Sequence, residues 1–198
     1  MCITQAIQPQ LLQARHLHAT GIPPALSEAT RELSVALMTQ MRNAGGSVSF
    51  DPNLRPSLWT SQEQMIREIN ALAALADWVL PGLGEGRLLT GFDDPADIAA
   101  FYLDQGAEAV AIKLGAEGAY YRTHLGQGFV AAVPVDKVVD TVGAGDGFAV
   151  GMISALLENL SFPEAVQRGN WIGSRAVQSR GDMEGLPTRS ELPTRSVA

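Results

Sequence analysis

Short apolar segments typical of β-strands alternate with helix-length segments along most of this chain. Residues 109–114 form an apolar run with one lysine, whereas residues 61–75 carry apolar side chains at three- and four-residue intervals. The first pattern is typical of a buried strand and the second of an amphipathic helix. Repeated strand–helix units predict a mainly parallel sheet covered by helices, because a parallel connection needs a long crossover. We therefore expect an α/β fold.

The same patterns define a set of elements, many of which begin or end at serine, proline or glycine. Ser27 is expected to cap the first long helix, which Gly45 and Gly46 terminate. The expected strands are residues 16–20, 47–51, 78–80, 109–114, 118–122 and 128–133, with the last two paired through a turn at Gly126. The expected helices are residues 27–43, 61–75, 85–90, 95–105, 144–158 and 162–178.

No linker or internal repeat interrupts this order, so residues 1–198 are expected to form a single domain. Residues 1–14 are predicted as a helical segment that leads into the first strand, and residues 52–59 as a loop. Residues 181–198 are rich in Gly, Pro, Thr and Ser, which predicts a loop and a flexible tail.

Composition excludes several functional classes. The chain has 198 residues, 46% of them hydrophobic, which suits one globular domain with a substantial core. Its 14 basic and 21 acidic residues give a net charge of −7, which argues against a nucleic-acid partner. Cys2 is the only cysteine, so an internal disulfide is excluded. No apolar run approaches the ~18 residues of a membrane span, so we expect a soluble, cytoplasmic protein without a membrane partner.

Residues 140–146 read Asp-Thr-Val-Gly-Ala-Gly-Asp and lead directly into an apolar helix. The first N–H groups of a helix have no internal partner and carry partial positive charge. Gly143, Ala144 and Gly145 are small enough to let a phosphoryl group approach those donors, and Asp146 can accept the proton of a hydroxyl nucleophile. Small residues before a helix also serve close packing, and an acidic first turn is ordinary, so the glycines alone leave both interpretations open.

A polar loop at residues 49–59 follows a predicted strand. Ligands of open parallel sheets bind beyond the carboxyl ends of the strands, so this loop is well placed for a substrate. Arg55 offers a guanidinium fork for a carboxylate or a phosphate, and Asn53 offers an amide. The alternative is an Asp-Pro-Asn turn whose side chains bond only their own backbone.

Glu85 lies at another junction between a strand and a helix, within a Gly-x-Gly-x-Gly run at residues 82–86. A carboxylate there can orient a magnesium-bound water, although it can equally be a plain first-turn glutamate. The run lacks the spacing of a dinucleotide fingerprint.

Lys113 ends the apolar run at residues 109–114, just before Gly115. Lysines seldom point into cores, so this one can face a nucleotide phosphate while Gly115 lets the chain pass close to the nucleotide. A lysine that extends to the solvent from the end of the strand is the alternative. No Walker A loop occurs, because the chain has no Gly-Lys-Ser/Thr.

Asn170 lies in the last predicted helix between Gly169 and Gly173. Internal glycines weaken a helix, so their presence indicates either close helix packing or close approach of a ligand. Ligand approach at Asn170 is the slightly favoured interpretation. The three histidines show no metal-ligand spacing, and a structural role is favoured for His18 at the end of a strand.

Taken together, these motifs resemble those of the ribokinase-like (PfkB) carbohydrate kinases. The pattern Asp-Thr-x-Gly-Ala-Gly-Asp is similar to the second signature of that family, and the Pro-Gly-x-x-Glu-Gly form at residues 81–86 resembles its 2-keto-3-deoxygluconate kinase branch. The family pattern at that point is Asn-x-x-Glu, and this chain has Gly82 in place of the asparagine. The resemblance is carried by residues 18–22, 50–59, 113–115, 140–146 and 185–187.

The resemblance implies a three-layer αβα core with a mainly parallel sheet, in which the family's N-terminal strands and β-sheet lid have no counterpart in this chain. It implies ATP-dependent phosphorylation of the primary hydroxyl of 2-keto-3-deoxygluconate, with Mg²⁺ and a monovalent cation as cofactors and a homo-oligomer as one assembly. Asp146 would be the base and residues 143–145 the anion hole. The residues that would bind substrate are Arg55, Asn53 and Asp146. Those that would bind nucleotide are Lys113, Gly115, Gly143, Gly145 and Asn170, and Glu85 would bind metal.

Three alternatives stand beside this interpretation. The chain can be a fructokinase-like sugar kinase, because related families share a similar loop. It can be a truncated, catalytically silent fragment that binds nucleotide or a partner, because the N-terminal third of the family pattern is absent. A nicotinamide-dependent oxidoreductase is weaker, because neither glycine cluster has the required spacing.

Overall fold

The computed structural model describes residues 13–193 of the chain. The helix expected at residues 1–14 therefore lies almost wholly outside the described residues, as do residues 194–198 of the expected tail. The described residues form two compact units. Unit 1 contains residues 13–112 and 122–127, and unit 2 contains residues 113–121 and 128–193. Each unit is described by itself.

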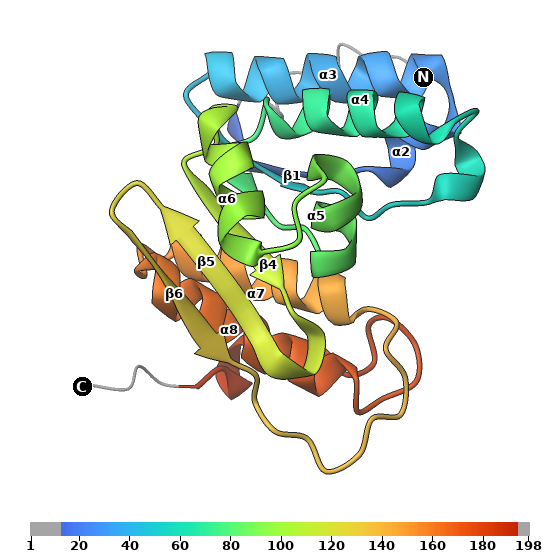
Figure 1. The fold of residues 1–198 in the computed structure, drawn as a ribbon. Helices are drawn as coiled ribbons and strands as arrows, with labels where there is room; N and C mark the ends of the chain where they lie inside the picture. The colour runs from blue at the N-terminus through green and yellow to red at the C-terminus, as the bar shows by residue number, and fades with distance from the viewer. Residues whose placement is uncertain (1–12, 194–198) are drawn as a thin grey trace. The chain divides into compact units, whose positions relative to one another are not determined.

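Parallel strands and the helices between them build unit 1 (Figure 1). The register pairs His16 with Ser47, Ser49 with Trp78, and Trp78 with Ala109, and each of these strand pairs is parallel. The strands are β1 (His16–Thr20), β2 (Ser47–Asp51), β3 (Trp78–Val79) and β4 (Ala109–Lys113). Within unit 1 the strand order is β1-β2-β3-β4, so each crossover joins neighbouring strands. The mainly parallel α/β architecture expected from the sequence is confirmed.

Side-chain caps explain where the helices of unit 1 begin. Ser27 and Ser61 accept hydrogen bonds from the N–H groups of Thr30 and Gln64, at 3.2 and 3.1 Å. Asp94 does the same for Ala96 at 2.7 Å. The helices are α2 (Ile22–Leu26), α3 (Glu28–Asn43), α4 (Gln62–Ala73), α5 (Leu83–Thr90) and α6 (Pro95–Asp104), with a 3-10 turn at Pro56–Leu58.

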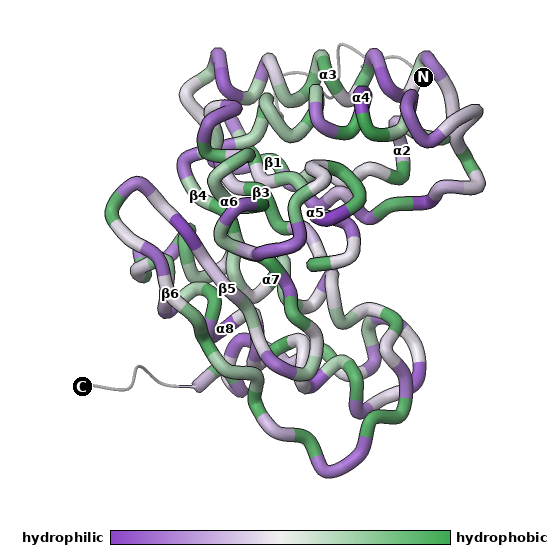
Figure 2. Tube along the Cα trace, in the orientation of Figure 1, coloured by the Kyte–Doolittle hydropathy of each residue, from purple (hydrophilic) through white to green (hydrophobic). Residues whose placement is uncertain are grey.

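The core of unit 1 lies between the sheet and these helices. Figure 2 shows apolar and polar positions alternating along α3 and α4, as expected for helices with one buried face. The largest fully buried side chains include Phe50, Met38, Met41, Met65, Ile69, Leu72, Ile98 and Tyr102. This packing fixes β2 and therefore the loop that follows it.

Unit 2 combines a β-hairpin with two long helices (Figure 1). Its elements are β5 (Gly118–Thr123), whose last two residues belong to unit 1, β6 (Gly126–Ala131), α7 (Ala144–Leu157) and α8 (Phe162–Ala176), with 3-10 turns at Gly115–Glu117 and Arg189–Glu191. The paired strands confirm the expected hairpin. Its turn lies at residues 124–125 rather than at Gly126, so β6 begins two residues earlier than predicted.

Glycines allow α7 and α8 to pack backbone against backbone. A Cβ atom on Gly151 would lie 2.7 Å from the Cα of Gly169 and 2.8 Å from the carbonyl oxygen of Arg168. A Cβ on Gly169 would lie 2.9 Å from the carbonyl oxygen of Phe148. Such distances exclude any side chain at these positions without movement of a helix. Close helix packing therefore accounts for Gly169, which was one of the two interpretations of its presence in a helix.

Among residues 13–193, no helix has both the length and the apolar character that a membrane crossing requires.

Candidate functional site

The residues from Asp140 to Asp146, which we call the glycine loop, begin α7 in unit 2. Gly143 is the N-cap residue and has a φ of +78°. A Cβ on Gly143 would also lie 2.6 Å from the carbonyl oxygen of Asp182. Both the backbone conformation and the close approach of residue 182 therefore require glycine here. The helix begins directly after it, because the N–H of Gly147 donates to the carbonyl of Gly143 at 2.8 Å.

The carboxylate of Asp140 fixes the shape of the glycine loop. Its Oδ1 accepts a hydrogen bond from the N–H of Val142 at 3.0 Å. That bond, further bonds from the N–H groups of Gly181 and Thr141, and the charge of Arg180 lower the pKa of Asp140. The carboxylate thus connects the loop before α7 to the segment after α8. The sequence contained the residue within its motif but gave no sign of this partner.

Positive charge converges on the start of α7. The ammonium nitrogen of Lys113 lies 3.6 Å from the position that a Cβ on Gly145 would occupy. It therefore lies beside the first turn of α7, where the end of the helix carries partial positive charge. Asp146 is in the same turn and its side chain is exposed. Within unit 2 the structure thus brings together Lys113, Gly143, Ala144, Gly145 and Asp146 at the start of α7.

Gly115 follows Lys113 and leaves open space. It has a φ of +62°, and no atom lies within 4 Å of the position of its missing Cβ. The positive φ, rather than crowding within the chain, is what favours glycine there. Contact of Gly115 with a nucleotide stays a prediction.

Asn170 has a structural partner that the sequence did not reveal. Its side chain is 8% exposed, and its Nδ2 donates to the carbonyls of Val130 and Ala131 at 2.9 and 3.1 Å. The amide therefore joins α8 to the end of β6, about forty residues away in the chain. Its predicted contact with nucleotide stays a prediction. Its amide nitrogen donates to backbone carbonyls of the protein.

The residues from Asp51 to Arg55, which we call the Arg55 loop, follow β2 in unit 1. The Oδ1 of Asp51 accepts from the N–H of Asn53 at 3.2 Å, and Asn53 has a φ of +38°. Arg55 donates from Nη1 to the Oδ1 of Asn53 at 2.7 Å and to the carbonyl of Leu54 at 2.9 Å. The loop thus bonds to itself, as the structural alternative anticipated. Arg55 is exposed, so its other N–H groups remain directed to solvent.

Glu85 contacts the same loop. Its Oε1 accepts from the N–H of Leu54 at 2.8 Å, and its Oε2 accepts from the N–H of Gly82 at 2.8 Å. The described residues contain no group of three His, Cys, Asp or Glu side chains that could hold a metal ion. The predicted metal role of Glu85 stays a prediction, and the structure adds a contact between residues 31 positions apart that the sequence could not show.

Two histidines form a polar seam across β1 and β2. His16 bonds to the hydroxyls of Ser47 and Ser49 at 2.8 Å each, and His18 bonds to Ser49 at 2.8 Å. The ring of His16 also stacks on Trp78, with centroids 4.8 Å apart. Burial, and secondarily the neighbouring His18, lowers the pKa of His16 to about 4. These contacts are consistent with the structural role favoured for His18.

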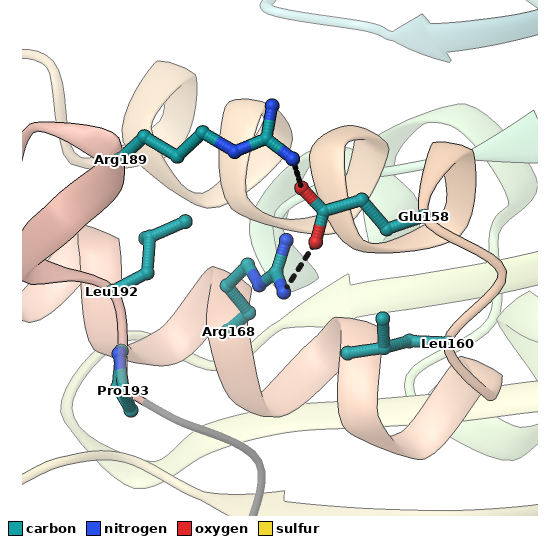
Figure 3. A pocket seen from close by; sticks show the side chains of 6 residues that line it. All are labelled: Glu158, Leu160, Arg168, Arg189, Leu192 and Pro193. Carbon is teal, nitrogen blue, oxygen red and sulfur yellow. Dashed lines mark hydrogen bonds and ion pairs between the residues drawn. The ribbon is translucent and has the colours of Figure 1, made fainter.

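A separate cavity of about 360 Å³ lies in unit 2 and is shown in Figure 3. Glu158 accepts from Arg168 at 2.9 Å and from Arg189 at 3.0 Å across it. Leu160, Leu192 and Pro193 complete its lining. The ion pairs tie the segment after α8 to the end of α7, and no sequence motif of the candidate site lies in this cavity.

A sequence model of the pfkB family of carbohydrate kinases matches residues 3–189. The 2-dehydro-3-deoxygluconokinase of Bacillus subtilis (strain 168) is 59% identical over 179 residues, which are 90% of this chain and 55% of that protein. The crystal structure of a PfkB protein from Polaromonas sp. JS666 is 57% identical, with a TM-score of 0.84 over 93% of this chain and 58% of that chain.

A structure of a putative ribokinase II from E. coli in complex with ATP and Mg²⁺ is 30% identical. Its TM-score is 0.82, over 91% of this chain and 57% of that chain. This chain therefore spans a little over half the length of the relatives that it matches.

Proposed function

The chain belongs to the pfkB family of carbohydrate kinases, and on that premise we propose that it takes part in ATP-dependent phosphorylation of 2-keto-3-deoxygluconate. One observation carries the proposal. The glycine loop presents the N-terminal turn of α7, the ammonium of Lys113 and the exposed carboxylate of Asp146 at one point in unit 2. Anion binding beside a proton acceptor is the arrangement that phosphoryl transfer to an alcohol requires.

Each group in this arrangement has a role in the proposed transfer. Asp146 accepts the proton of the attacking hydroxyl. The N–H groups of residues 143–146 donate to the oxygens of the transferred phosphoryl group, whose charge they stabilise. Lys113 adds a full positive charge beside the same oxygens. This local concentration of positive potential offsets a chain charge of −7, which would otherwise repel an anionic nucleotide.

Magnesium is the cofactor that accompanies ATP, and it would neutralise charge between the phosphates. It usually binds through the phosphates, several waters and one or two carboxylates, so a dedicated cluster of protein ligands is not needed. The donor chemistry of this chain fits that mode, because single carboxylates, rather than groups of three metal-binding side chains, occur in the described residues. A monovalent cation is a second proposed cofactor.

Substrate binding is assigned to Arg55 and Asn53. A sugar acid carries a carboxylate, and the guanidinium N–H groups of Arg55 that remain directed to solvent suit such a group. The similarity to a 2-dehydro-3-deoxygluconokinase at 59% identity supports this substrate over a neutral sugar. Fructose is the alternative substrate, because fructokinase-like enzymes have a similar loop.

The test is a substrate panel with the full chain. Phosphorylation of 2-keto-3-deoxygluconate and of fructose is followed with Mg-ATP, and ATP and NAD binding are measured by calorimetry. We expect ATP to bind, NAD not to bind, and the sugar acid to be phosphorylated with a higher kcat/KM than fructose. A higher kcat/KM for fructose would contradict the proposed substrate and identify fructose in its place. ATP binding without any turnover would contradict the proposed activity and indicate that the chain is a catalytically silent fragment that binds nucleotide.

A further inference from the structure

Two glutamates of this chain occupy the same position in their helices but accept different hydrogen bonds. Glu85 in α5 and Glu164 in α8 are each the third residue of a capping box. A single oxygen of Glu164, Oε2, accepts both the N–H and the hydroxyl of Ser161, at 2.8 and 2.6 Å. Glu85 caps its helix with Oε2 alone, so Oε1 is available for a second partner.

That second partner is the backbone of the Arg55 loop. Oε1 of Glu85 accepts the N–H of Leu54 at 2.8 Å. Leu54 lies between Asn53, whose backbone has a φ of +38°, and Arg55, whose guanidinium bonds to Asn53 and to the carbonyl of Leu54. A non-glycine residue at positive φ persists only where its surroundings hold it. The bond to Leu54 therefore holds the loop at its most unusual point.

The surroundings of Glu85 are partly removed from solvent. The hydroxyl of Tyr102 is buried and has no hydrogen-bond partner among residues 13–193. Burial, and secondarily the charge of Glu85, raises the pKa of that hydroxyl. The half-buried carboxylate of Glu85 thus lies near a buried hydroxyl, and a hydrogen bond to a charged acceptor gains strength as water is excluded around it.

We propose that Glu85 is a positioning residue that holds the Arg55 loop in the form that presents Arg55 to the sugar acid. This inference rests on the proposed function for its substrate. It differs from the metal role that the sequence suggested, because both oxygens of the carboxylate are directed to backbone N–H groups of the protein. Its effect on catalysis should therefore appear in sugar binding and not in the requirement for magnesium.

Glu85→Gln tests the proposal with minimal change in shape. Glutamine has one acceptor oxygen and an NH₂ donor, so it can keep the cap on Gly82 but then turns a donor toward the N–H of Leu54. Glutamine is also accepted at this position of a capping box. Glu164→Gln is the matched control, because one oxygen of Glu164 accepts both the N–H and the hydroxyl of Ser161, and the amide oxygen can keep these two bonds.

Three quantities are measured on the full chain and both variants. They are hydrogen exchange of the Leu54 amide, the KM for 2-keto-3-deoxygluconate, and the magnesium concentration that gives half-maximal rate. In Glu85→Gln we expect exchange at Leu54 and the KM to rise roughly tenfold each, with kcat and the magnesium requirement changed less than about twofold. Glu164→Gln should leave all three unchanged.

The outcomes separate this inference from the proposed function. Unchanged exchange at Leu54 in Glu85→Gln overturns the positioning role, whether or not the chain is active. A raised magnesium requirement with an unchanged KM also overturns it, in favour of a metal role. If the unaltered chain neither binds nor phosphorylates any sugar, the proposed function fails and the substrate part of this inference fails with it, while the exchange measurement still decides whether Glu85 holds the loop.

Discussion

The glycine loop precedes helix α7 and the Arg55 loop follows strand β2, and the two loops are held in different ways. The glycine loop offers backbone N–H groups, and its shape depends on Gly143, whose missing side chain admits residue 182. The Arg55 loop offers side chains, and it is held by hydrogen bonds among Asp51, Asn53 and Arg55 together with Glu85. The first tolerates no side chain at residue 143, whereas the second depends on hydrogen bonds between polar groups.

This difference predicts which property of the protein, stability or binding, a change in each loop should affect. A loop that binds anions through its backbone requires a rigid support, because a small displacement moves every donor at once. A loop that binds through side chains can lose one contact while the fold remains intact. Changes near the glycine loop should therefore affect stability and activity together, and changes in the Arg55 loop should affect binding alone.

The largest effect on stability is expected from Gly151→Ala, which forces apart the helices beneath the glycine loop. The new Cβ would lie 2.7 Å from the Cα of Gly169, so one helix must shift. We expect the free energy of unfolding to fall by about 2–4 kcal/mol, as measured by urea denaturation. Gly84→Ala is the control, because no neighbouring atom lies within 4 Å of the position of the missing Cβ in that helical glycine. Its free energy of unfolding should rise by up to about 1 kcal/mol, since alanine favours a helix over glycine. Equal effects of both changes would contradict the packing argument.

The second largest loss of stability is expected from Gly143→Ala, which changes the glycine loop itself. The change combines a φ of +78° with a Cβ only 2.6 Å from the carbonyl oxygen of Asp182. We expect a loss of about 2–3 kcal/mol in unfolding free energy and of most phosphoryl transfer. Gly45→Ala has a φ of +79° without a nearby atom, so it should lose only about 1 kcal/mol. The comparison fails if the two glycines respond alike.

Arg55→Ala should change binding and leave stability intact. The exposed guanidinium bonds only within its own loop among the contacts observed, so the unfolding free energy should move by less than about 0.5 kcal/mol. The KM for the sugar acid should rise about tenfold while the KM for ATP stays constant. Arg67→Ala, which removes an exposed arginine paired with Glu68, should change neither constant. A KM for the sugar acid that does not move would remove Arg55 from the site.

The smallest expected effect is a pH dependence that originates at His16 in β1. The pKa of His16 is lowered to about 4 in the folded chain, whereas the unfolded residue titrates near its ordinary value of 6.5. The unfolded state therefore binds the proton first, and stability should decline as the pH falls from about 6.5 toward 4. We expect the Tm to fall over this range, and His16→Gln to flatten part of that decline. His124→Gln, at an exposed position, should retain the full pH dependence.

Local patterns in the sequence were enough to predict most of the fold. Ser27 caps its helix as expected, because an N-cap acts on residues only two or three positions away. Ser61, predicted as the first residue of its helix, is the N-cap of that helix. The first short helix, Ile22–Leu26, escaped prediction because Pro23 and Pro24 look like helix breakers, although proline is favoured in a first turn. The turn of the β5–β6 hairpin was displaced because Gly126 marks the start of β6 rather than the turn itself.

The candidate site was predictable only where its residues are neighbours in sequence. The glycine loop is one continuous motif, so its turn into α7 could be predicted, whereas its contacts with residues 181 and 182 could not. The bonds from Glu85 to Leu54 and from Asn170 to β6 join residues about thirty and forty positions apart. No local pattern encodes such contacts, because they depend on how separate elements pack. The sequence therefore indicated that these polar residues matter without showing which partner each of them has.

The central claim is that the glycine loop and Asp146 perform phosphoryl transfer, and single-turnover kinetics of Asp146→Asn test it most directly. Transfer from Mg-ATP to 2-keto-3-deoxygluconate is compared between the unaltered chain and this variant, and ATP binding is measured in parallel. We predict ATP binding unchanged within about threefold and transfer slower by about 10²–10⁴-fold, as expected for loss of a general base. Equal transfer rates in the two proteins, or no transfer by the unaltered chain, would contradict the account.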